Sequence, residues 1–260
     1  MNDSPLAGLR IAVTRPDPGA DELAAMLSDS GATAVRLPLT RVTGPADPAP
    51  LRRALERLAS YDWIVFTSSN GARFLARALH MMPAPAPVPR ARIVTVGAAT
   101  RAAVTAELGW RVDVEPAEQR GAAIVPAMSA TAALRGRRVL WPRARAARPT
   151  IRRDLAAAGA ILDDPETYGT EAVPEAAAEL AQRLTRRELD AIILTSPSGV
   201  AALAAAHPDV GACIVAVIGP TTAAAARSAG LPVHVEPESH TIPALVNGLV
   251  RFVARSRQQP

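Results

Sequence analysis

Two short polar segments of this chain combine the residue types that hold anions. Thr-Ser-Ser-Asn-Gly occupies positions 67–71 and Thr-Ser-Pro-Ser-Gly occupies positions 195–199. Each follows a short apolar run and precedes a stretch rich in alanine and leucine, so each is predicted to join a strand to a helix. The first N–H groups of a helix lack partners within it and attract anions, and serine and threonine hydroxyls add donors. For either segment alone, simple capping of the helix is the preferred alternative.

Three more loops, at 14–16, 97–100 and 219–222, also place small polar residues directly after an apolar run. In open parallel sheets, ligands bind outside the carboxyl ends of the strands, where all five loops are expected to lie. For the five loops together, a shared anion-binding cleft and plain capping both remain open. None of them matches Gly-x-Gly-x-x-Gly, so a dinucleotide site is disfavoured.

The chain contains arginine but no lysine, and this excludes classes of enzyme that depend on a lysine side chain. The absence of lysine excludes a Walker-type phosphate loop and Schiff-base or pyridoxal-phosphate chemistry. Eight arginines lie within 135–153, and most of them are expected to form a solvated basic surface. Arg143 and Arg145 differ because they directly follow a predicted strand. Since arginine binds carboxylates in a bidentate manner, a ligand with several carboxylates would use such residues.

The sequence contains few other patterns of residues that are typical of a catalytic site. The four histidines stand apart without ligand spacing and Cys213 is the single cysteine, so neither a metal site nor an internal disulfide is expected. No Ser-His-Asp or Cys-His pattern can be drawn. Tyr168 is one of two tyrosines and lies in the polar stretch 163–170, where a packing role is the alternative to a catalytic one.

Length and composition set the class of protein. The 260 residues are 49% hydrophobic and 20% charged, which predicts a globular chain of two domains. No apolar run approaches the roughly 18 residues that span a membrane, and the first residues do not resemble a signal peptide, so a cytoplasmic location is expected. The net charge of +5 could attract nucleic acid or an acidic small molecule. Aromatic residues are few and no helix-turn-helix or zinc-finger spacing is present, so nucleic acid is disfavoured.

Five blocks of sequence recur in the same order in the two halves. The blocks that include Gly8, Gly31 and Thr67 are repeated 128 positions later, and the last two blocks are repeated 122 and 121 positions later. The change of spacing coincides with the proline-rich stretch 82–89 of the first half, which is interpreted as a surface spacer of polyproline type. An internal duplication is the interpretation of the repeat, with chance similarity in an alanine-rich chain as the alternative.

Each block is interpreted as a strand followed by a helix. Short runs rich in valine and isoleucine predict the strands. Apolar residues at three- and four-residue spacing predict the helices, which Gly31 and Gly159 are placed to end. Alternating strands and helices of this length imply parallel sheets covered on both faces. The expected fold class is therefore α/β, with two open parallel-sheet domains of the flavodoxin or Rossmann type.

The order and spacing of these features resemble the uroporphyrinogen-III synthase family over about residues 8–250. The matching features are Ile11–Pro16, Phe66–Ser68, Val96 and Gly97 with Thr100, Arg143 with Arg148, Tyr168, Thr195–Gly199 and Ile218–Thr222. The resemblance implies two α/β domains joined by a two-stranded connector. One domain would contain 1–37 and 173–260, the other 43–164, with connectors at about 38–42 and 165–172, so that each repeat is divided between the domains.

The resemblance also implies an activity. The family closes hydroxymethylbilane, a linear tetrapyrrole with eight carboxylates, to uroporphyrinogen III with inversion of ring D and loss of water, and uses no metal or organic cofactor. Tyr168 matches the family's tyrosine and would donate a hydrogen bond to the leaving hydroxyl. We expect a monomer that receives its substrate from the preceding hydroxymethylbilane synthase. The expected substrate-binding residues are Thr14, Arg15, Ser68, Ser69, Gly97, Thr100, Arg143, Ser196, Ser198, Gly199, Gly219, Thr221 and Thr222.

The chain departs from the family before the strand that leads to Gly219, and its loop Ser69-Asn70-Gly71 lies where relatives vary. One alternative function also stays open. Some relatives carry a lysine before the strand that leads to Gly219, whereas this chain has Cys213-Ile214-Val215, so a carboxylate contact from that position is missing. The alternative is a non-catalytic tetrapyrrole or anion sensor that uses 135–153 as a docking surface. A sensor would bind a tetrapyrrole without turnover.

Overall fold

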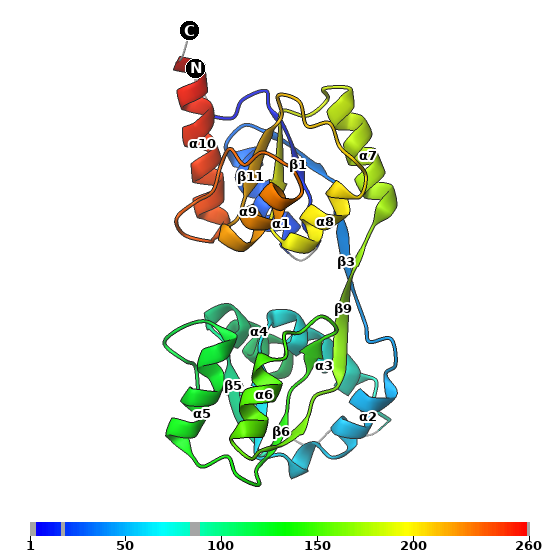
Figure 1. Ribbon diagram of the computed structural model, residues 1–260, viewed down its shortest axis with the longest axis vertical. Coiled ribbons are helices and arrows are strands. Elements are labelled where there is room, and N and C mark those ends of the chain that lie inside the picture. The colour runs from blue at the N-terminus through cyan, green and yellow to red at the C-terminus, as the bar shows by residue number, and fades with distance from the viewer. Residues whose placement is uncertain (1–3, 17–18, 84–88, 259–260) are drawn as a thin grey trace. The chain divides into compact units, whose positions relative to one another are not determined.

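The computed structural model describes residues 4–16, 19–83 and 89–258, so most of the proline-rich stretch 82–89 lies outside the described residues. Contacts divide the chain into two compact units. Unit 1 contains Met1–Val42 and Glu171–Pro260, and unit 2 contains Thr43–Thr170. Each unit has a central sheet with helices packed on it (Figure 1).

Unit 1 is built on a four-stranded parallel sheet in the order β11-β10-β1-β2. Its strands are β1 (Arg10–Val13), β2 (Thr33–Arg36), β10 (Ala191–Leu194) and β11 (Ile214–Val217). A parallel bridge between Ala216 and Val235 extends the sheet beyond β11. On one face pack α7 (Pro174–Thr185), α8 (Pro197–Ala204) and α9 (Pro220–Ser228), and on the other α1 (Ala20–Asp29) and α10 (Ile242–Gln258).

Unit 2 repeats this arrangement with strands in the order β5-β4-β6-β8, again all parallel. Its strands are β4 (Trp63–Phe66), β5 (Arg92–Thr95), β6 (Arg138–Leu140) and β8 (Ile161–Asp163). The helices are α2 (Ala49–Glu56), α3 (Ser69–His80) and α4 (Ala98–Leu108) on one face, and α5 (Ile124–Thr131) and α6 (Thr150–Ala157) on the other. Short 3₁₀ turns occupy Leu58–Ser60 and Gly121–Ala123.

A third sheet contains the segments at which the chain passes from one unit to the other. It has the order β3-β9-β7, with β3 (Thr40–Thr43), β9 (Glu166–Ala172) and β7 (Arg143–Ala144). The pairing of β7 with β9 is irregular: Arg143 lies opposite Glu166 and Ala144 opposite Tyr168, so Thr167 is the extra residue of a bulge. Such a bulge changes the direction in which the neighbouring side chains point.

The predicted α/β class with parallel sheets is confirmed. Because both faces of each sheet are covered, the central strands β4 and β10 are buried along their whole length, which explains their continuous apolar sequences. The predicted ends of two helices are also confirmed. Gly31 and Gly159 follow α1 and α6 with φ angles of +90° and +75°, a conformation that residues with a Cβ adopt only with strain.

The two sheets have the same strand register. Ile11 pairs with Ala191 in unit 1, and the positions 128 residues from them, Val139 and Trp63, pair in unit 2. A side-chain contact also recurs, because the carboxylates of Asp190 and Asp62 accept the backbone N–H of Arg10 and Arg138 at 2.7 and 2.9 Å. The repeat of the sequence therefore corresponds to a repeat of strand pairing, in which each sheet contains strands from both halves of the chain.

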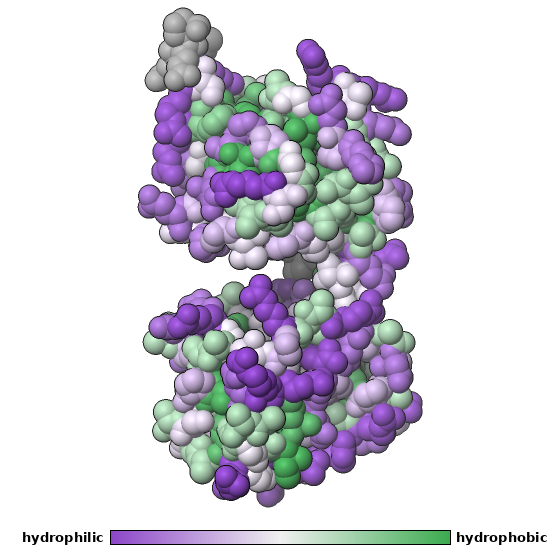
Figure 2. Space-filling view, viewed as in Figure 1, coloured by the Kyte–Doolittle hydropathy of each residue, from purple (hydrophilic) through white to green (hydrophobic). Residues whose placement is uncertain are grey.

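The surface of the described residues carries few large hydrophobic side chains. Met81 and Ile161 are the exposed ones, and the face shown in Figure 2 mixes hydrophilic and hydrophobic residues over both units. Among the described residues, no helix has the length and apolar character needed to cross a bilayer.

Candidate active site

Tyr168 is held in unit 2 by contacts at both ends of its side chain. Its phenolic oxygen lies 2.7 Å from Ser68 Oγ, and its ring stacks on Phe74 with centroids 5.9 Å apart and an interplanar angle of 25°. The residue is 8% exposed, so its position is fixed by packing while its hydroxyl keeps a polar partner. Burial raises the pKa of Tyr168 above its ordinary value, and the hydrogen bond with Ser68 opposes this shift. Like an ordinary phenol, whose pKa is about 10, Tyr168 is protonated at neutral pH and can donate a hydrogen bond.

Four expected site residues of unit 2 lie at the beginnings of α3 and α4. Ser68 caps α3 by accepting the Gly71 N–H at 3.1 Å. Ser69 Oγ donates to the carbonyl of Ala99 at 3.1 Å, which ties the start of α3 to that of α4. Gly97 precedes α4, and Thr100, in the first turn, is buried. A hydrogen bond thus joins Ser68 to Tyr168, whereas the hydroxyl of the neighbouring Ser69 is directed to α4.

The expected site residues of unit 1 lie at the beginnings of α8 and α9 and at the end of β1. Ser196 caps α8 by accepting the Gly199 N–H at 3.1 Å, and its Oγ lies 3.0 Å from that of Ser198. In the first turn of α9, after Gly219, Thr221 is exposed and Thr222 is buried. The capping role offered as the alternative for the polar segments is therefore present at Ser68 and Ser196.

At the end of β1 the polar groups are partly occupied. Thr14 Oγ1 donates to the carbonyl of Ile193 at 2.6 Å, so this buried hydroxyl holds β1 to β10. Arg15 is half-buried beside Gly19. Burial lowers the pKa of Arg15, and the charge of Glu22 opposes the shift. Of these two expected residues, only Arg15 carries a charge that could meet a substrate carboxylate.

Arg143 is engaged by the protein itself. Its Nε donates to Asp164 through both the backbone carbonyl, at 3.0 Å, and Oδ2, at 3.2 Å. Its Nη1 donates to the carbonyls of Ala144 and Arg145 at 3.0 and 3.3 Å. With these intramolecular bonds, Arg143 holds the turn after β7. Its contact with a substrate carboxylate stays a prediction, and it would require either donation from Nη2 or the breaking of some of these bonds.

Sequence reasoning missed several residues next to the expected ones. A Cβ at Gly97 would lie 2.7 Å from the Gln119 side chain, and one at Gly219 would lie 2.7 Å from the His240 ring. Gln119 and His240 are 121 positions apart, the spacing of the last repeated block, so the repeat itself was the signal that could have found them. Phe74 had no such signal, because its contact with Tyr168 depends on how β9 passes α3.

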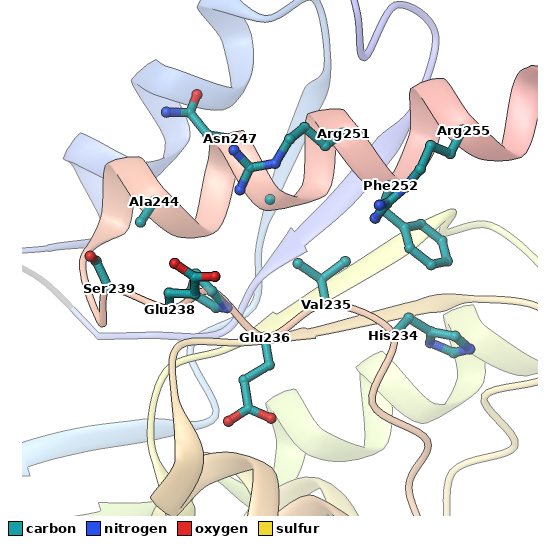
Figure 3. Close-up of a pocket in the computed structure, with 12 residues that line it drawn as sticks. His234, Val235, Glu236, Glu238, Ser239, Ala244, Asn247, Arg251, Phe252 and Arg255 are labelled. Carbon is teal, nitrogen blue, oxygen red and sulfur yellow. The ribbon is translucent and has the colours of Figure 1, made fainter.

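Two cavities differ in their relation to these residues. One of about 590 Å³ lies in unit 1 between 234–239 and α10, with Arg251, Arg255 and Glu238 at its edge (Figure 3), and none of its lining residues is an expected site residue. Another of about 430 Å³ lies in unit 2 and is lined in part by Phe74 and Thr167, neighbours of Tyr168. Among the described residues, no group of three His, Cys, Asp or Glu side chains is placed to hold a metal ion.

Glu166 fixes the strand that carries Tyr168. Its Oε1 accepts the Ala46 N–H at 3.1 Å and Arg145 Nε at 2.9 Å. Burial would raise the pKa of Glu166, but the hydrogen bonds from Ala46 and Arg145 and the nearby arginine charges outweigh it and lower the pKa. Since folding lowers this pKa, the stabilisation is complete above the pKa of an unfolded glutamate, about 4.3, and is lost as pH falls through the folded value.

We expect Glu166→Gln to lower the free energy of unfolding of unit 2 at pH 7 by about 1 kcal/mol, after allowing for solvent screening of a partly exposed pair. The difference from the unchanged protein should shrink below about pH 4.5, near the unfolded pKa. All three tryptophans lie in unit 2, so urea unfolding followed by tryptophan fluorescence reports on this unit.

The matched control is Glu56→Gln, because Glu56 is also in unit 2 and pairs with Arg52 at 4.0 Å on the exposed face of α2. It should change stability little at either pH. A stability gap for Glu166→Gln that is the same at pH 7 and pH 3.5 would contradict the electrostatic explanation.

Comparison with known sequences points to one family. The family model described as "Uroporphyrinogen-III synthase HemD" matches residues 21–247. A "Uroporphyrinogen-III synthase" of Synechococcus elongatus is 27% identical over 267 residues, covering 98% of this chain and all of the relative. A "Porphyrin biosynthesis protein HemD" of Ruminiclostridium josui is 28% identical over 251 residues, covering 95% of this chain and 49% of the relative. The chain thus spans about half the length of this second relative.

Comparison with solved structures agrees in fold. A mutant uroporphyrinogen III synthase of Thermus thermophilus matches with a TM-score of 0.66 at 20% identity, over 95% of this chain and all of that one. Uroporphyrinogen-III synthetase of Helicobacter pylori 26695 matches with a TM-score of 0.62 at 16% identity, over 94% of this chain and 99% of that one. The resemblance drawn from the sequence is confirmed by a family model that spans most of the chain, and the chain belongs to the uroporphyrinogen-III synthase family.

Proposed function

We propose that this protein closes hydroxymethylbilane to uroporphyrinogen III, with inversion of ring D and release of water, and that Tyr168 is the group that assists the departure of the hydroxyl. The observation that carries the proposal is the buried phenol of Tyr168, 2.7 Å from Ser68 Oγ at the start of α3, in a chain of this family. The proposal includes no metal ion and no organic cofactor.

The chemistry asks little covalent work of the protein. The pyrrole nitrogen of the substrate pushes out the hydroxyl of the neighbouring hydroxymethyl group, and a hydrogen-bond donor at that oxygen makes it a better leaving group. Tyr168 can fill this role because a phenol, with an ordinary pKa of about 10, carries its proton at neutral pH, and because Ser68 and Phe74 hold it in place. The rest of the catalytic effect would come from holding the linear chain folded so that its ends meet.

The carboxylates of the substrate would be held at the helix N-termini of both units. Free backbone N–H groups and hydroxyls there favour anions without needing a metal ion. The proposed contacts are Thr14, Arg15, Ser68, Ser69, Gly97, Thr100, Arg143, Ser196, Ser198, Gly199, Gly219, Thr221 and Thr222. Thr14, Ser68 and Arg143 already make hydrogen bonds within the protein, and these bonds support a positioning role for the three residues.

The organisation of the chain forms part of the same proposal. The two domains would be 1–37 with 173–260 and 43–164, with connectors at about 38–42 and 165–172, and the two halves of the sequence would derive from a duplication. The matching strand registers of the two sheets support the duplication. The proposal also includes that the protein is a monomer in the cytoplasm and accepts its substrate from hydroxymethylbilane synthase.

The test is a coupled assay with freshly made hydroxymethylbilane. The products are oxidised, and the type I and type III uroporphyrin isomers are separated. Closure without catalysis gives type I, so a large shift to type III is the expected result. A folded preparation that yields only type I would overturn the proposed activity and would direct attention to binding without turnover.

A further inference from the structure

One helix supplies both side chains that hold Tyr168. Ser68, the residue that caps α3, lies 2.7 Å from the phenolic oxygen. Phe74, within the same helix, stacks on the phenol ring, and the guanidinium of Arg77, one turn further, lies over the Phe74 ring at 5.0 Å. The oxygen and the ring of Tyr168 are thus both positioned by α3, although the residue itself belongs to β9.

The backbone of Tyr168 is fixed independently of α3. Its carbonyl accepts the Arg145 N–H at 2.8 Å, and the preceding residue, Thr167, forms the bulge opposite β7. Thr167 is fully buried and its hydroxyl donates to the carbonyl of Pro165 at 3.2 Å. Since the main chain is held on the β7 side, the contacts with Ser68 and Phe74 determine where the side chain points.

At 2.7 Å, either hydroxyl of the Ser68–Tyr168 pair could be the donor, and the two directions have different consequences for the Tyr168 proton. Ser68 Oγ already accepts the Gly71 N–H, and the serine has a single hydroxyl proton to give. If that proton goes to the phenolic oxygen, the proton of Tyr168 remains free for a substrate oxygen. This bond also strengthens as the phenol gives up its proton, because a hydrogen bond to a developing negative charge is stronger than one to a neutral oxygen.

We propose that Ser68 is a positioning residue for Tyr168, donating its hydroxyl proton to the phenolic oxygen while Phe74 fixes the ring, so that the Tyr168 O–H points to the leaving hydroxyl of the substrate. The catalytic consequence rests on the proposed function, whereas the hydrogen bond itself does not. The role given to Ser68 above is thereby revised: its hydroxyl proton goes to Tyr168, so Ser68 leaves the set of proposed carboxylate contacts.

Unit 1 contains the matched control for this arrangement. Ser196 lies 128 positions from Ser68 and caps α8 with the same 3.1 Å bond, but its hydroxyl meets Ser198. At the position 128 residues before Tyr168 stands Thr40, so the first half of the chain has no counterpart of the phenol. Loss of either serine removes a helix cap, and only the loss of Ser68 removes a partner of Tyr168.

The experiment combines a spectroscopic signature with kinetics. The full chain is labelled with tyrosine carrying ¹³C at the ring carbon bonded to oxygen, and Tyr168→Phe assigns the two signals. Ser68→Ala should move the Tyr168 signal at pH 7.5, Ser68→Thr should restore it, and Ser196→Ala should leave it unchanged. Ser68→Ala and Ser196→Ala should lower the stability of their own units to a similar degree, so a general loss of structure cannot explain a difference between them.

In the isomer assay, Ser68→Ala should lower kcat about tenfold with KM nearly unchanged, and Phe74→Leu should lower it about threefold. A rise in KM with unchanged kcat and an unchanged Tyr168 signal would overturn the proposal and make Ser68 a carboxylate contact. An unchanged Tyr168 signal would overturn it whatever the kinetics. If the unchanged protein gave no type III product while the signal still moved in Ser68→Ala, the hydrogen bond would stand and the proposed function would fail.

Discussion

Replacing Tyr168 by phenylalanine is expected to lower kcat for type III formation about 100-fold or more, since a positioned acid typically contributes a factor of this size. The substitution removes a single oxygen and leaves the ring stacked on Phe74, 5.9 Å between centroids, so substrate should still bind. Product affinity should therefore change little, which separates loss of acid catalysis from loss of binding. Initial rates in the isomer assay and equilibrium binding of uroporphyrinogen III measure the two quantities.

Tyr61→Phe is the matched control, because Tyr61 is the other tyrosine of the chain and also lies in unit 2. Its hydroxyl donates to Asp163 Oδ2 at 2.6 Å, and it is 3% exposed. Loss of this hydroxyl should weaken folding while kcat stays close to that of the unchanged protein. If Tyr168→Phe lost kcat and product affinity by the same factor, the tyrosine would be a binding residue and its role as an acid would be wrong.

The sequence predicts residue types at the site better than it predicts their partners. Ser68 and Ser196 could be found because a polar segment after an apolar run is a local pattern, and both indeed begin helices. The partner of Ser68 could not be found in this way, because Tyr168 lies 100 residues away along the chain. Only the path of β9 past α3 brings the two hydroxyls together.

Arg143 is a second residue whose place could be predicted from the sequence but whose partner could not. Its position after a strand indicates that it lies at the correct edge of the sheet, and it does follow β6 there. The same rule also brings Asp164 to this edge, since it follows β8, the neighbour of β6. A pattern that places a cation at the site therefore also places its counter-charge there, and the sequence alone does not show which contact the arginine makes.

The repeat could be found in the sequence, but periodicity did not show that each sheet combines strands from both halves of the chain. Counting along the chain assigns β1 to one half and β10 to the other, yet these strands pair in one sheet. Likewise β4 of the first half pairs with β6 of the second. Equal spacing shows which strands correspond, but strand pairing is a long-range property. The family resemblance implied only that each repeat is divided between the domains, and the structure supplies the pairing.

The second large expected effect is on stability. Trp63→Ala should lower the free energy of unfolding of unit 2 by about 3–5 kcal/mol, the usual cost of removing a large buried aromatic side chain. Trp63 is 2% exposed and packs in the core beneath α5 and α6. Urea unfolding followed by the fluorescence of the remaining tryptophans, Trp110 and Trp141, measures the change.

The equivalent position in unit 1 already holds the smaller residue, and this makes the substitution informative. Ala191 occupies the same register in its sheet as Trp63 does in the sheet of unit 2. In unit 1 this position is covered by α10, which spans Ile242–Gln258. The helix at the corresponding place in unit 2 is α5, which spans only Ile124–Thr131. The longer helix brings Leu245, Val246 and Leu249 to that face of the sheet, so we infer that its side chains fill the volume that the indole fills in unit 2. Alanine at position 63 would lack this compensation and leave a cavity.

Trp110→Ala provides the comparison for this test, because Trp110 is only partly buried and packs at the rim of the other core of unit 2, 6.3 Å from Phe66 between ring centroids. Its loss should cost clearly less than the loss of Trp63, since the rim can be refilled by water. Equal costs for the two substitutions would mean that α5 moves in to close the space under the sheet. In that case the inference that α10 fills, over Ala191, the volume that the Trp63 indole fills in unit 2 would be wrong.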